Sequence, residues 1–385
     1  MSNHPHVIVG GGIIGLSIGW ELLRNGAEHV EIYEAGEAVR SGATWVAAGM
    51  LAPRAEANFE EVGIYHAGVA SLNAYPDFLA RLEEDANEVP RLDTCGSLMI
   101  ATNIDDKREL DRQFEFRKRI GCPAERLDGT AAREREPLLG PRVTSALWLD
   151  GDAQINNRTL ALALKQAYLK RGGLLHEHTR VQAVTRDGDR LGVRTSSSLP
   201  ALELEFAHTQ AATVTIATGA NVQIEGIDPI PVRPVKGQMI GLRAEPFAML
   251  RQPILATKAY LVPKDDTRLL IGTTAEEVGF DKRVTAGPIL NILHRAWEMV
   301  PAIYELEIEE ILTGFRPTPR DHKPIVGRGT TDNLYYATGH YRHGILHAPL
   351  AARMIADLIV ANKWDARFDE FLPSRFLSKK EPVAA

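Results

Sequence analysis

The order of apolar and polar residues near the N-terminus predicts a strand–helix–strand unit. Residues 6–9 form a short apolar run that stops at three glycines, which is typical of a buried strand. Residues 13–25 carry apolar side chains at helical spacing, and Gly26 stands where a glycine commonly ends a helix. Residues 30–33 are again apolar. This is a β-α-β unit of about 30 residues, which indicates an α/β fold.

The rest of the chain mixes predicted helices with predicted strands. Residues 66–130 are mostly helical and charged, whereas strands dominate after residue 229. Asp187-Gly188 and the polar turn 264–267 each predict a hairpin. Further helices are expected at 67–84, 104–120, 157–172, 289–300 and 345–361, and strands at 98–100, 174–195, 214–217, 260–263, 269–273 and 334–337; residues 148–153 are expected to form a loop and the end of the chain after 372 to fray.

Composition narrows the class of protein. The 385 residues include 44 Lys and Arg and 50 Asp and Glu, a net charge of 44 − 50 = −6. A chain without an overall basic field is a poor candidate for binding nucleic acid. Cys95 and Cys122 are the two cysteines, which excludes a disulfide scaffold and a zinc ribbon.

The distribution of apolar residues predicts a soluble protein. No apolar run approaches the roughly 20 residues that span a bilayer. The N-terminus lacks the basic segment of a signal peptide. We therefore expect a cytoplasmic protein without a membrane span.

A glycine fingerprint lies inside the β-α-β unit. Gly10, Gly12 and Gly15 follow the first strand and open the helix, and Glu34 directly follows the second strand. In this pattern the glycines allow a tight turn and the close approach of a pyrophosphate, which the helix N-terminus attracts. A carboxylate at Glu34 would accept hydrogen bonds from ribose hydroxyls and repel a 2′-phosphate. The pattern predicts a dinucleotide other than NADP, although a plain β-α-β turn also uses glycine.

Two more segments favour a flavin as the dinucleotide. Residues 40–51 are small and contain Gly42 and Gly49, so their backbone can pass close to a flat ring. Residues 339–345 are rich in glycine and lead into the last predicted helix. The N-terminus of that helix would stabilise negative charge on a reduced ring.

These motifs together resemble the D-amino acid oxidase family of flavoproteins, and within it the bacterial glycine oxidase group of thiazole synthesis. The resemblance spans nearly the whole chain in family order. It implies a Rossmann-like FAD-binding domain with an inserted antiparallel-sheet substrate domain. The matching segments are 7–15, 47–51, 217–220, 234–238, 260–263, 314–317, 323–327 and 339–345.

The resemblance also implies domain boundaries and a cofactor site. The FAD-binding domain would comprise 1–80, 150–225 and 312–375, the substrate domain 81–149 and 226–311, and a flexible tail 376–385. FAD would be bound non-covalently, because residues 41–51 hold no His and neither Cys lies late in the chain. The implied cofactor-binding residues are Gly10, Gly12, Ile13, Ile14, Gly15, Glu34, Thr44, Ala47, Ala48, Gly49, Met50, Val181, Thr218, Gly219, His340, Tyr341, Arg342, His343, Gly344 and Ile345.

The implied reaction moves a hydride from the Cα of an amino acid to flavin N5. Arg316 would hold the substrate carboxylate, since its fork is bidentate, and Tyr260 would donate its hydroxyl to the same group. Arg342 would lie near the substrate, and Met50 would line the pocket. Without the resemblance, Arg316 could equally be a surface ion-pair partner, Tyr260 a core tyrosine and Arg342 a brace for the flavin loop.

The expected products are glyoxylate or another 2-oxo acid, ammonia or an amine, and H₂O₂ from molecular oxygen. Ala275 is smaller than the residue that glycine-selective relatives can carry about here, so sarcosine, N-ethylglycine, D-alanine and D-proline are also candidate substrates. His340 and His343 have no accompanying carboxylate cluster, so no metal is expected.

Two other functions stay open from the sequence. One is a D-amino acid dehydrogenase that passes electrons to a quinone or another non-oxygen acceptor. The other is a flavin-binding partner subunit without turnover, against which Tyr260 and Arg316 argue. The resemblance further implies a homo-oligomer, a dimer or a tetramer, and an imine product that feeds thiazole synthesis.

Overall fold

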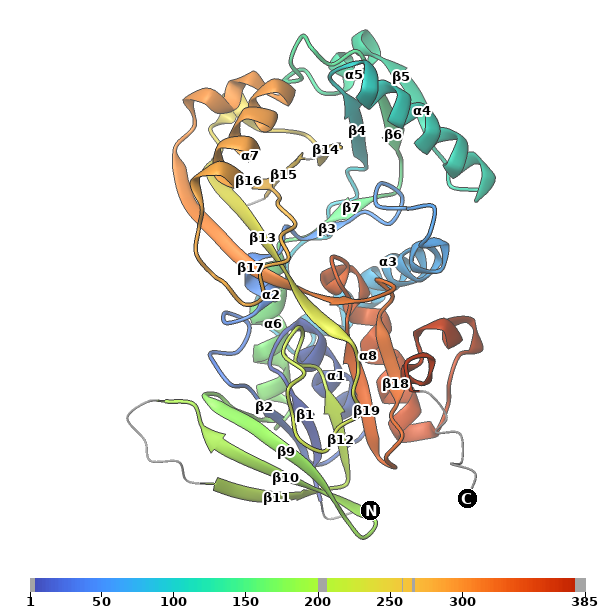
Figure 1. Ribbon diagram of the computed structural model, residues 1–385, viewed down its shortest axis with the longest axis vertical. Helices are drawn as coiled ribbons and strands as arrows, with labels where there is room; N and C mark the ends of the chain where they lie inside the picture. Colours follow the sequence, from blue (N-terminus) through green and yellow to red (C-terminus); the bar gives the residue numbers. More distant parts are fainter. Residues whose placement is uncertain (1–3, 200–205, 258, 265–266, 378–385) are drawn as a thin grey trace, which may run out of the picture.

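The computed structural model describes residues 4–199, 206–257, 259–264 and 267–377. A six-stranded sheet forms the lower part of the molecule in Figure 1. Five of its strands are mutually parallel, and only the edge strand β18 is antiparallel to its neighbour. The strand order is β18 (Ile325–Arg328), β19 (Leu334–Thr338), β12 (Thr213–Ile216), β1 (His6–Val9), β2 (Val30–Tyr33) and β8 (Leu174–His176).

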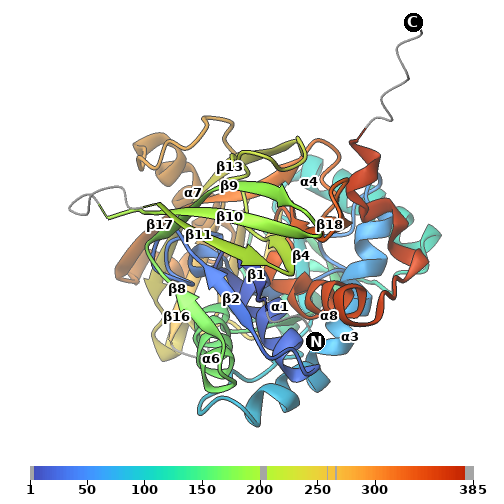
Figure 2. The ribbon, with the colours of Figure 1, turned by 90° about the horizontal axis from the view of Figure 1, so that it is seen from below.

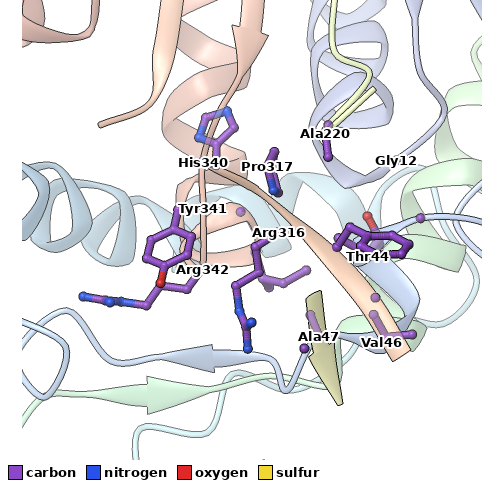
Figure 3. Close-up of a pocket in the computed structure, with 18 of the residues that line it drawn as sticks. Gly12, Thr44, Val46, Ala47, Ala220, Arg316, Pro317, His340, Tyr341 and Arg342 are labelled. Carbon is purple, nitrogen blue, oxygen red and sulfur yellow. The ribbon is translucent and has the colours of Figure 1, made fainter. Parts of the chain in front are cut away.

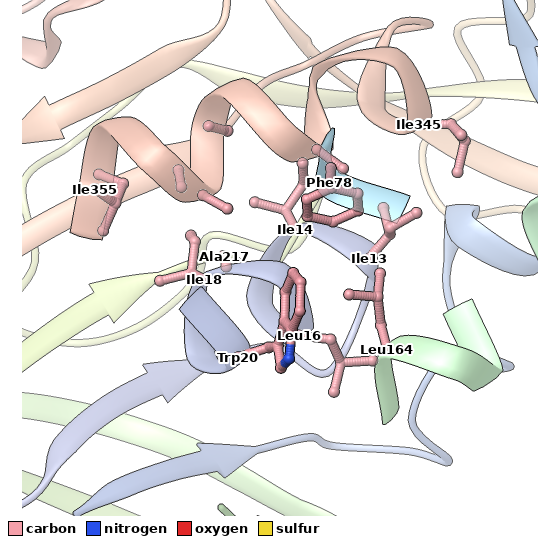
Figure 4. Close-up of a cluster of buried hydrophobic side chains, with 14 of the residues drawn as sticks. Ile13, Ile14, Leu16, Ile18, Trp20, Phe78, Leu164, Ala217, Ile345 and Ile355 are labelled. Atoms are coloured by element: carbon pink, nitrogen blue, oxygen red, sulfur yellow. The ribbon is translucent and has the colours of Figure 1, made fainter. Parts of the chain in front are cut away.

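Helices pack against one face of this sheet and form the largest core. Trp20 on the first helix is fully buried and meets the ring of Phe78 edge to face, with ring centroids 5.3 Å apart. Figure 4 shows this core where the N-terminal helix passes the last long helix. The helices are α1 (Ile13–Arg24), α3 (Val62–Glu83), α6 (Asn157–Lys170) and α8 (Gly344–Ala361).

Helix α8 is an internal element of this core. It is long and apolar enough to cross a membrane by length and composition, but 61% of it is buried inside the protein. It packs against α1 and α3, which accounts for its apolar character.

A three-stranded antiparallel sheet lies beside the six-stranded sheet, at the bottom of Figure 1 and across the front of Figure 2. Apolar residues of both sheets share one cluster, which includes Val7, Val193 and Val214. The predicted hairpin at Asp187-Gly188 is confirmed, because it joins the first two of these strands. The strands are β9 (Thr179–Asp187), β10 (Arg190–Ser197) and β11 (Phe206–Ala211).

An eight-stranded, mostly antiparallel sheet forms the upper part of the molecule in Figure 1. Helix α7 (Ala286–Met299) covers it through a second apolar core. The order is β17 (Ile308–Pro319), β13 (Val232–Arg243), β16 (Arg268–Gly272), β15 (Ala259–Pro263), β14 (Ile254–Ala256), β4 (Ser97–Ala101), β6 (Ser145–Leu149) and β5 (Glu125–Asp128); α4 (Ile104–Arg119) and α5 (Gly129–Arg135) lie beside its last strands.

This arrangement confirms the expected α/β class with a second, antiparallel sheet. Strand β17 runs across the predicted boundary at 311 and 312, and the domain boundaries themselves stay a prediction. The remaining elements are short: α2 (Ala43–Val46), β3 (Met50–Leu51), β7 (Ala153–Gln154) and the 3₁₀ turns Pro246–Ala248, Pro301–Glu305, Ala366–Phe371 and Pro373–Arg375.

The expected loop at 148–153 is wrong at both ends. Trp148 and Leu149 complete β6, and Ala153 begins β7, which pairs with β3. Only the turn around Asp150 and Gly151 separates them. The prediction failed because polar turn residues dominate this stretch, whereas the two strands form by pairing with strands that lie far away in the sequence. The expectation that the chain frays directly after 372 is wrong, because Pro373–Arg375 form a 3₁₀ turn and Arg375 Nε donates to Asp321 Oδ2 at 2.7 Å. Residues 265–266 of the predicted hairpin turn and 378–385 of the predicted tail lie outside the described residues.

Candidate active site

One large cavity extends along the six-stranded sheet and reaches the eight-stranded sheet. Its volume is about 1110 Å³, and its lining includes residues of both sheets (Figure 3). Small-molecule pockets usually reach about 1,000 Å³ at most. The cavity is therefore large enough for a dinucleotide together with a small second molecule.

The glycine fingerprint forms one end of the cavity. Gly10 has a φ of +115°, and a Cβ there would collide with the carbonyl of Ala217. A Cβ on Gly15 would collide with the carbonyl of Gly10, so this glycine packs the helix on the strand. At Gly12 a Cβ would meet only Thr44 Oγ1 within 4 Å, at 3.3 Å. The backbone at the start of α1 is thus open to the cavity, as a pyrophosphate requires.

Glu34 lies on the cavity wall directly after β2. One carboxylate oxygen accepts the N–H of Gly11 at 2.8 Å, and the other accepts the N–H of Gly36 at 2.8 Å. These bonds fix the carboxylate beside the glycine turn. The second lone pair of each oxygen remains available to a ribose hydroxyl.

The small-residue segment after Glu34 is held from behind by α6. The Thr44 hydroxyl accepts the N–H of Ile13 at 3.0 Å, which ties the segment to the start of α1. The Thr44 carbonyl accepts a hydrogen bond from Asn157 at 2.8 Å, and Arg158 donates to the Trp45 carbonyl at 3.1 Å. The backbone that lines the cavity is therefore anchored on side chains outside it.

A buried lysine supports the next part of the same segment. The Ile155 N–H donates to the Gly49 carbonyl at 2.9 Å, and Lys264 Nζ donates to the Ile155 carbonyl at 3.0 Å. Lys264 is 5% exposed. It links the hairpin strand β15 to the backbone around Gly49.

Another part of the wall consists of residues 340–342 and the start of α8. Burial, with a smaller contribution from His343, lowers the pKa of His340 to about 3, so its ring is neutral at physiological pH. Neither ring nitrogen of His340, nor the buried Thr218 hydroxyl, has a hydrogen-bond partner among the described residues. Such unsatisfied buried atoms on a cavity wall fit a bound polar molecule. This lining fits FAD, whose pyrophosphate the start of α1 would hold.

Arg316 projects from β17 into the cavity (Figure 3). Its Nη1 donates to the Thr274 carbonyl at 3.0 Å, and its Nη2 donates to the Thr273 hydroxyl at 2.8 Å. These neutral partners orient the guanidinium without cancelling its charge. Arg316 can therefore bind a small carboxylate bidentately.

Tyr260 lies on β15 in the same cavity. Its hydroxyl lies 3.3 Å from the Met239 sulfur. Burial raises the pKa of Tyr260 to about 12, even though Arg316 acts in the opposite direction. The phenol is therefore a neutral donor, suited to a carboxylate oxygen.

Arg342 is bound by two carboxylates. Its Nη2 donates to Glu61 Oε2 at 3.1 Å, and its Nε lies 3.4 Å from Glu56 Oε1. Nη2 also donates to the Glu56 carbonyl at 3.3 Å. Arg342 lines the cavity with its charge already compensated, and a direct role toward substrate stays a prediction.

Glu56 is a cavity residue that the sequence patterns did not indicate. Burial alone would raise the pKa of its carboxyl, but His343, Arg342 and Arg316 lower it below the ordinary value. Glu56 is thus ionised beside two arginines. The segment of small residues predicted to pass the ring ends at Leu51, so it does not include Glu56. A single acidic residue in a turn has no sequence pattern that would indicate a site.

Most of the predicted site residues share this one cavity. Arg316, Tyr260, Arg342, Met50 and Ala275 all line it. All predicted cofactor residues line it as well, except Gly15, which packs under the turn, and His343, which lies behind Glu56. Among the described residues no group of three or more His, Cys, Asp or Glu could hold a metal ion.

Comparison with known proteins shows the family of the chain. The family model described as DAO, FAD dependent oxidoreductase, matches residues 6–358. The chain is 35% identical to a glycine oxidase of Geobacillus kaustophilus over 358 residues, which cover 91% of this chain and 92% of the relative. It is 33% identical to the bifunctional protein ThiO/ThiG of Trichormus variabilis, of which the match covers 55%.

Solved structures show the same architecture. The crystal structure of glycine oxidase from Geobacillus kaustophilus superposes with a TM-score of 0.88 at 33% identity, covering 97% of this chain and 99% of that one. An iminodiacetate oxidase from Chelativorans sp. BNC1, with 24% identity and a TM-score of 0.82, shares the fold.

The fold and the cavity define an FAD-dependent oxidoreductase of the amino acid oxidase class. The chain belongs to the DAO family, and FAD is its cofactor.

Proposed function

We propose that this enzyme oxidatively deaminates glycine and related small amines, with molecular oxygen as the acceptor. The observation that carries the proposal is the meeting of Arg316 and Tyr260 in the cavity that also holds the glycine fingerprint. The relatives named glycine oxidase support the choice of substrate class.

The protein side of the reaction is binding and orientation. Arg316 takes the substrate carboxylate as a bidentate ion pair, and the Tyr260 hydroxyl donates to the same group. Both side chains are fixed before substrate arrives, through Thr273 and the packing of β15 on β16. FAD, when bound, supplies the hydride acceptor for the substrate Cα–H bond. The resulting imine hydrolyses to glyoxylate or another 2-oxo acid and ammonia or an amine.

Ala275 supports a substrate range wider than glycine. It lines the cavity with only a methyl group and is exposed. Sarcosine, N-ethylglycine, D-alanine and D-proline therefore belong to the proposed range. The relative named ThiO/ThiG supports a further proposal, that the imine product feeds thiazole synthesis. We also propose that the enzyme is cytoplasmic and forms a homo-oligomer.

The test is a peroxide-release panel on the purified yellow protein. Glycine, sarcosine, D-alanine and D-proline are each supplied in air, and a redox dye replaces oxygen in a parallel series. Peroxide formed from glycine or sarcosine supports the proposal. Turnover with the dye but no peroxide in air would favour a dehydrogenase, and no turnover in either series would contradict both.

A further inference from the structure

Glu56 is held at a fixed place on the cavity wall by the residues before it. The Arg54 and Ala55 N–H groups both donate to the Asp152 carboxylate at 3.0 Å. The guanidinium of Arg117 donates to the carbonyls of the same two residues, each at 2.8 Å. Asp152 and Arg117 are fully buried. The turn that carries Glu56 is therefore braced from both sides, and its carboxylate is preorganised.

The Glu56 carboxylate is charged but poorly satisfied. Its side chain is 14% exposed, and the nearest donors are Arg342 Nε at 3.4 Å and His343 Nδ1 at 3.3 Å. Both distances exceed those of ordinary N–H···O bonds, and neither nitrogen makes a hydrogen bond within the described residues. A mostly buried carboxylate needs strong donors, because its desolvation is otherwise uncompensated. The open space in front of it is the cavity.

The cavity wall carries charges of both signs, as an amino acid does at its two ends. Among the described residues, the hydrogen bonds of the Arg316 guanidinium go to neutral groups, and the charged neighbours of the Glu56 carboxylate stay beyond ordinary hydrogen-bond distance. The charge of Arg316 lowers the pKa of Glu56, and the charge of Glu56 in turn raises the pKa of Tyr260, so the three groups lie within electrostatic range of one another. An amino acid carries its carboxylate and its amino group on adjacent carbons.

We propose that Glu56 is a substrate-binding residue that accepts a hydrogen bond from the substrate's amino group while Arg316 holds the carboxylate. This inference rests on the proposed function and specifies its substrate class as compounds with an N–H donor beside a carboxylate. A carboxylate ligand without a donor gains nothing from Glu56 and is repelled by it.

A purely structural role for Glu56 would act through Arg342. Glu61 provides the matched control, because its carboxylate also binds Arg342, at 3.1 Å, but does not line the cavity. Glu61 also pairs with His322 at 2.9 Å and is 5% exposed. Any effect that Glu56 transmits only through Arg342 should appear in Glu61→Gln as well.

The experiment compares glycine with acetate in the FAD-loaded wild type, Glu56→Gln and Glu61→Gln. Steady-state kinetics give kcat and KM for glycine, and flavin absorbance changes give the Kd of acetate, which has the carboxylate but no N–H. In Glu56→Gln we expect the KM for glycine to rise about 10-fold, as expected when a charged acceptor becomes neutral. The acetate Kd should stay equal or fall. In Glu61→Gln the ratio of the KM for glycine to the Kd of acetate should equal that of the wild type.

Two results would overturn the inference. One is a Glu56→Gln enzyme whose glycine KM equals that of the wild type. The other is a parallel loss of glycine and acetate binding that Glu61→Gln reproduces, which would make Glu56 a brace for Arg342. Failure of the proposed function is distinguishable, since the wild type itself would then oxidise none of the amines.

Discussion

The guanidinium of Arg316 lies directly against Gly237 of the neighbouring strand, where a Cβ atom would come within 2.7 Å of Nη1 and 2.8 Å of Nη2. Strands β13 and β17 pair along this stretch, with Gly237 opposite Gly314. The absence of a side chain at Gly237 is thus what allows Arg316 to reach Thr273 and Thr274. A substitution at this position should displace the flexible guanidinium rather than the backbone.

Gly237→Ala tests this relationship. We expect the variant to fold and to retain FAD. Its KM for glycine should rise about 10-fold or more, because the displaced guanidinium of Arg316 no longer reaches the substrate carboxylate with both nitrogens. Steady-state kinetics and a thermal melt of the same preparation measure the two effects. An unchanged KM would mean that the position of Arg316 does not determine substrate binding.

Tyr260→Phe tests the neutral hydroxyl donor. Because the pKa of Tyr260 is raised to about 12, the phenol keeps its proton at pH values well below 12. The substitution should lower kcat/KM about 10-fold by removing one hydrogen bond to a charged group. The ratio of wild type to variant should be constant from about pH 6 to pH 10, well below the raised pKa. A ratio that falls toward 1 above pH 8 would show that the phenol ionises there.

Glu34→Gln tests the nucleotide end of the cavity. The amide cannot accept from both Gly11 and Gly36, and it offers a weaker acceptor to a ribose hydroxyl. We expect the Kd of FAD to rise about 10-fold or more. Titration of the apoprotein with FAD, followed by flavin fluorescence, measures this constant. The exposed Glu28→Gln is the control, and an equal effect in both variants would assign the change to net charge.

Lys264→Met tests the support behind Gly49. The variant retains the apolar stem but leaves the Ile155 carbonyl without the Nζ donor. Loss of this bond should weaken FAD binding about 5-fold or more and lower the melting temperature by a few degrees. FAD titration and thermal melts check both expectations. Wild-type FAD affinity would show that the backbone at Gly49 holds its position without the lysine.

The elements found correctly from the sequence are those whose signals are local. Gly10, Gly12 and Gly15 stand within six residues, and the helix and strands around them follow a simple period. The hairpin at Asp187-Gly188 was equally plain because its turn residues are adjacent. Strand β6 was not predicted, and its last two residues were assigned to a loop, because its pairing with β4 and β5 is long-range, whereas Asp150 and Gly151 give a strong local turn signal.

The site was predictable only where a residue stands in a motif. Arg316 and Tyr260 lie in segments that resemble the family, and both line the cavity. Glu56 acquires its place from Asp152 and Arg117, which are 96 and 61 positions away in the chain (152 − 56 and 117 − 56). No spacing rule connects such residues. The pairing of Arg342 with Glu56 and Glu61 could not be predicted either, because these residues are also far apart in the sequence.

The most direct test of the central claim is the anaerobic reduction of the bound flavin by glycine in the wild type and in Arg316→Ala. Loss of the flavin's visible absorbance reports electron transfer from substrate without any assumption about the acceptor. We predict full reduction of the wild-type flavin and an efficiency of reduction about 100-fold or more lower in Arg316→Ala, since a bidentate ion pair is lost. A wild-type flavin that glycine, sarcosine, D-alanine and D-proline all leave oxidised, or equal rates in the two proteins, would contradict it.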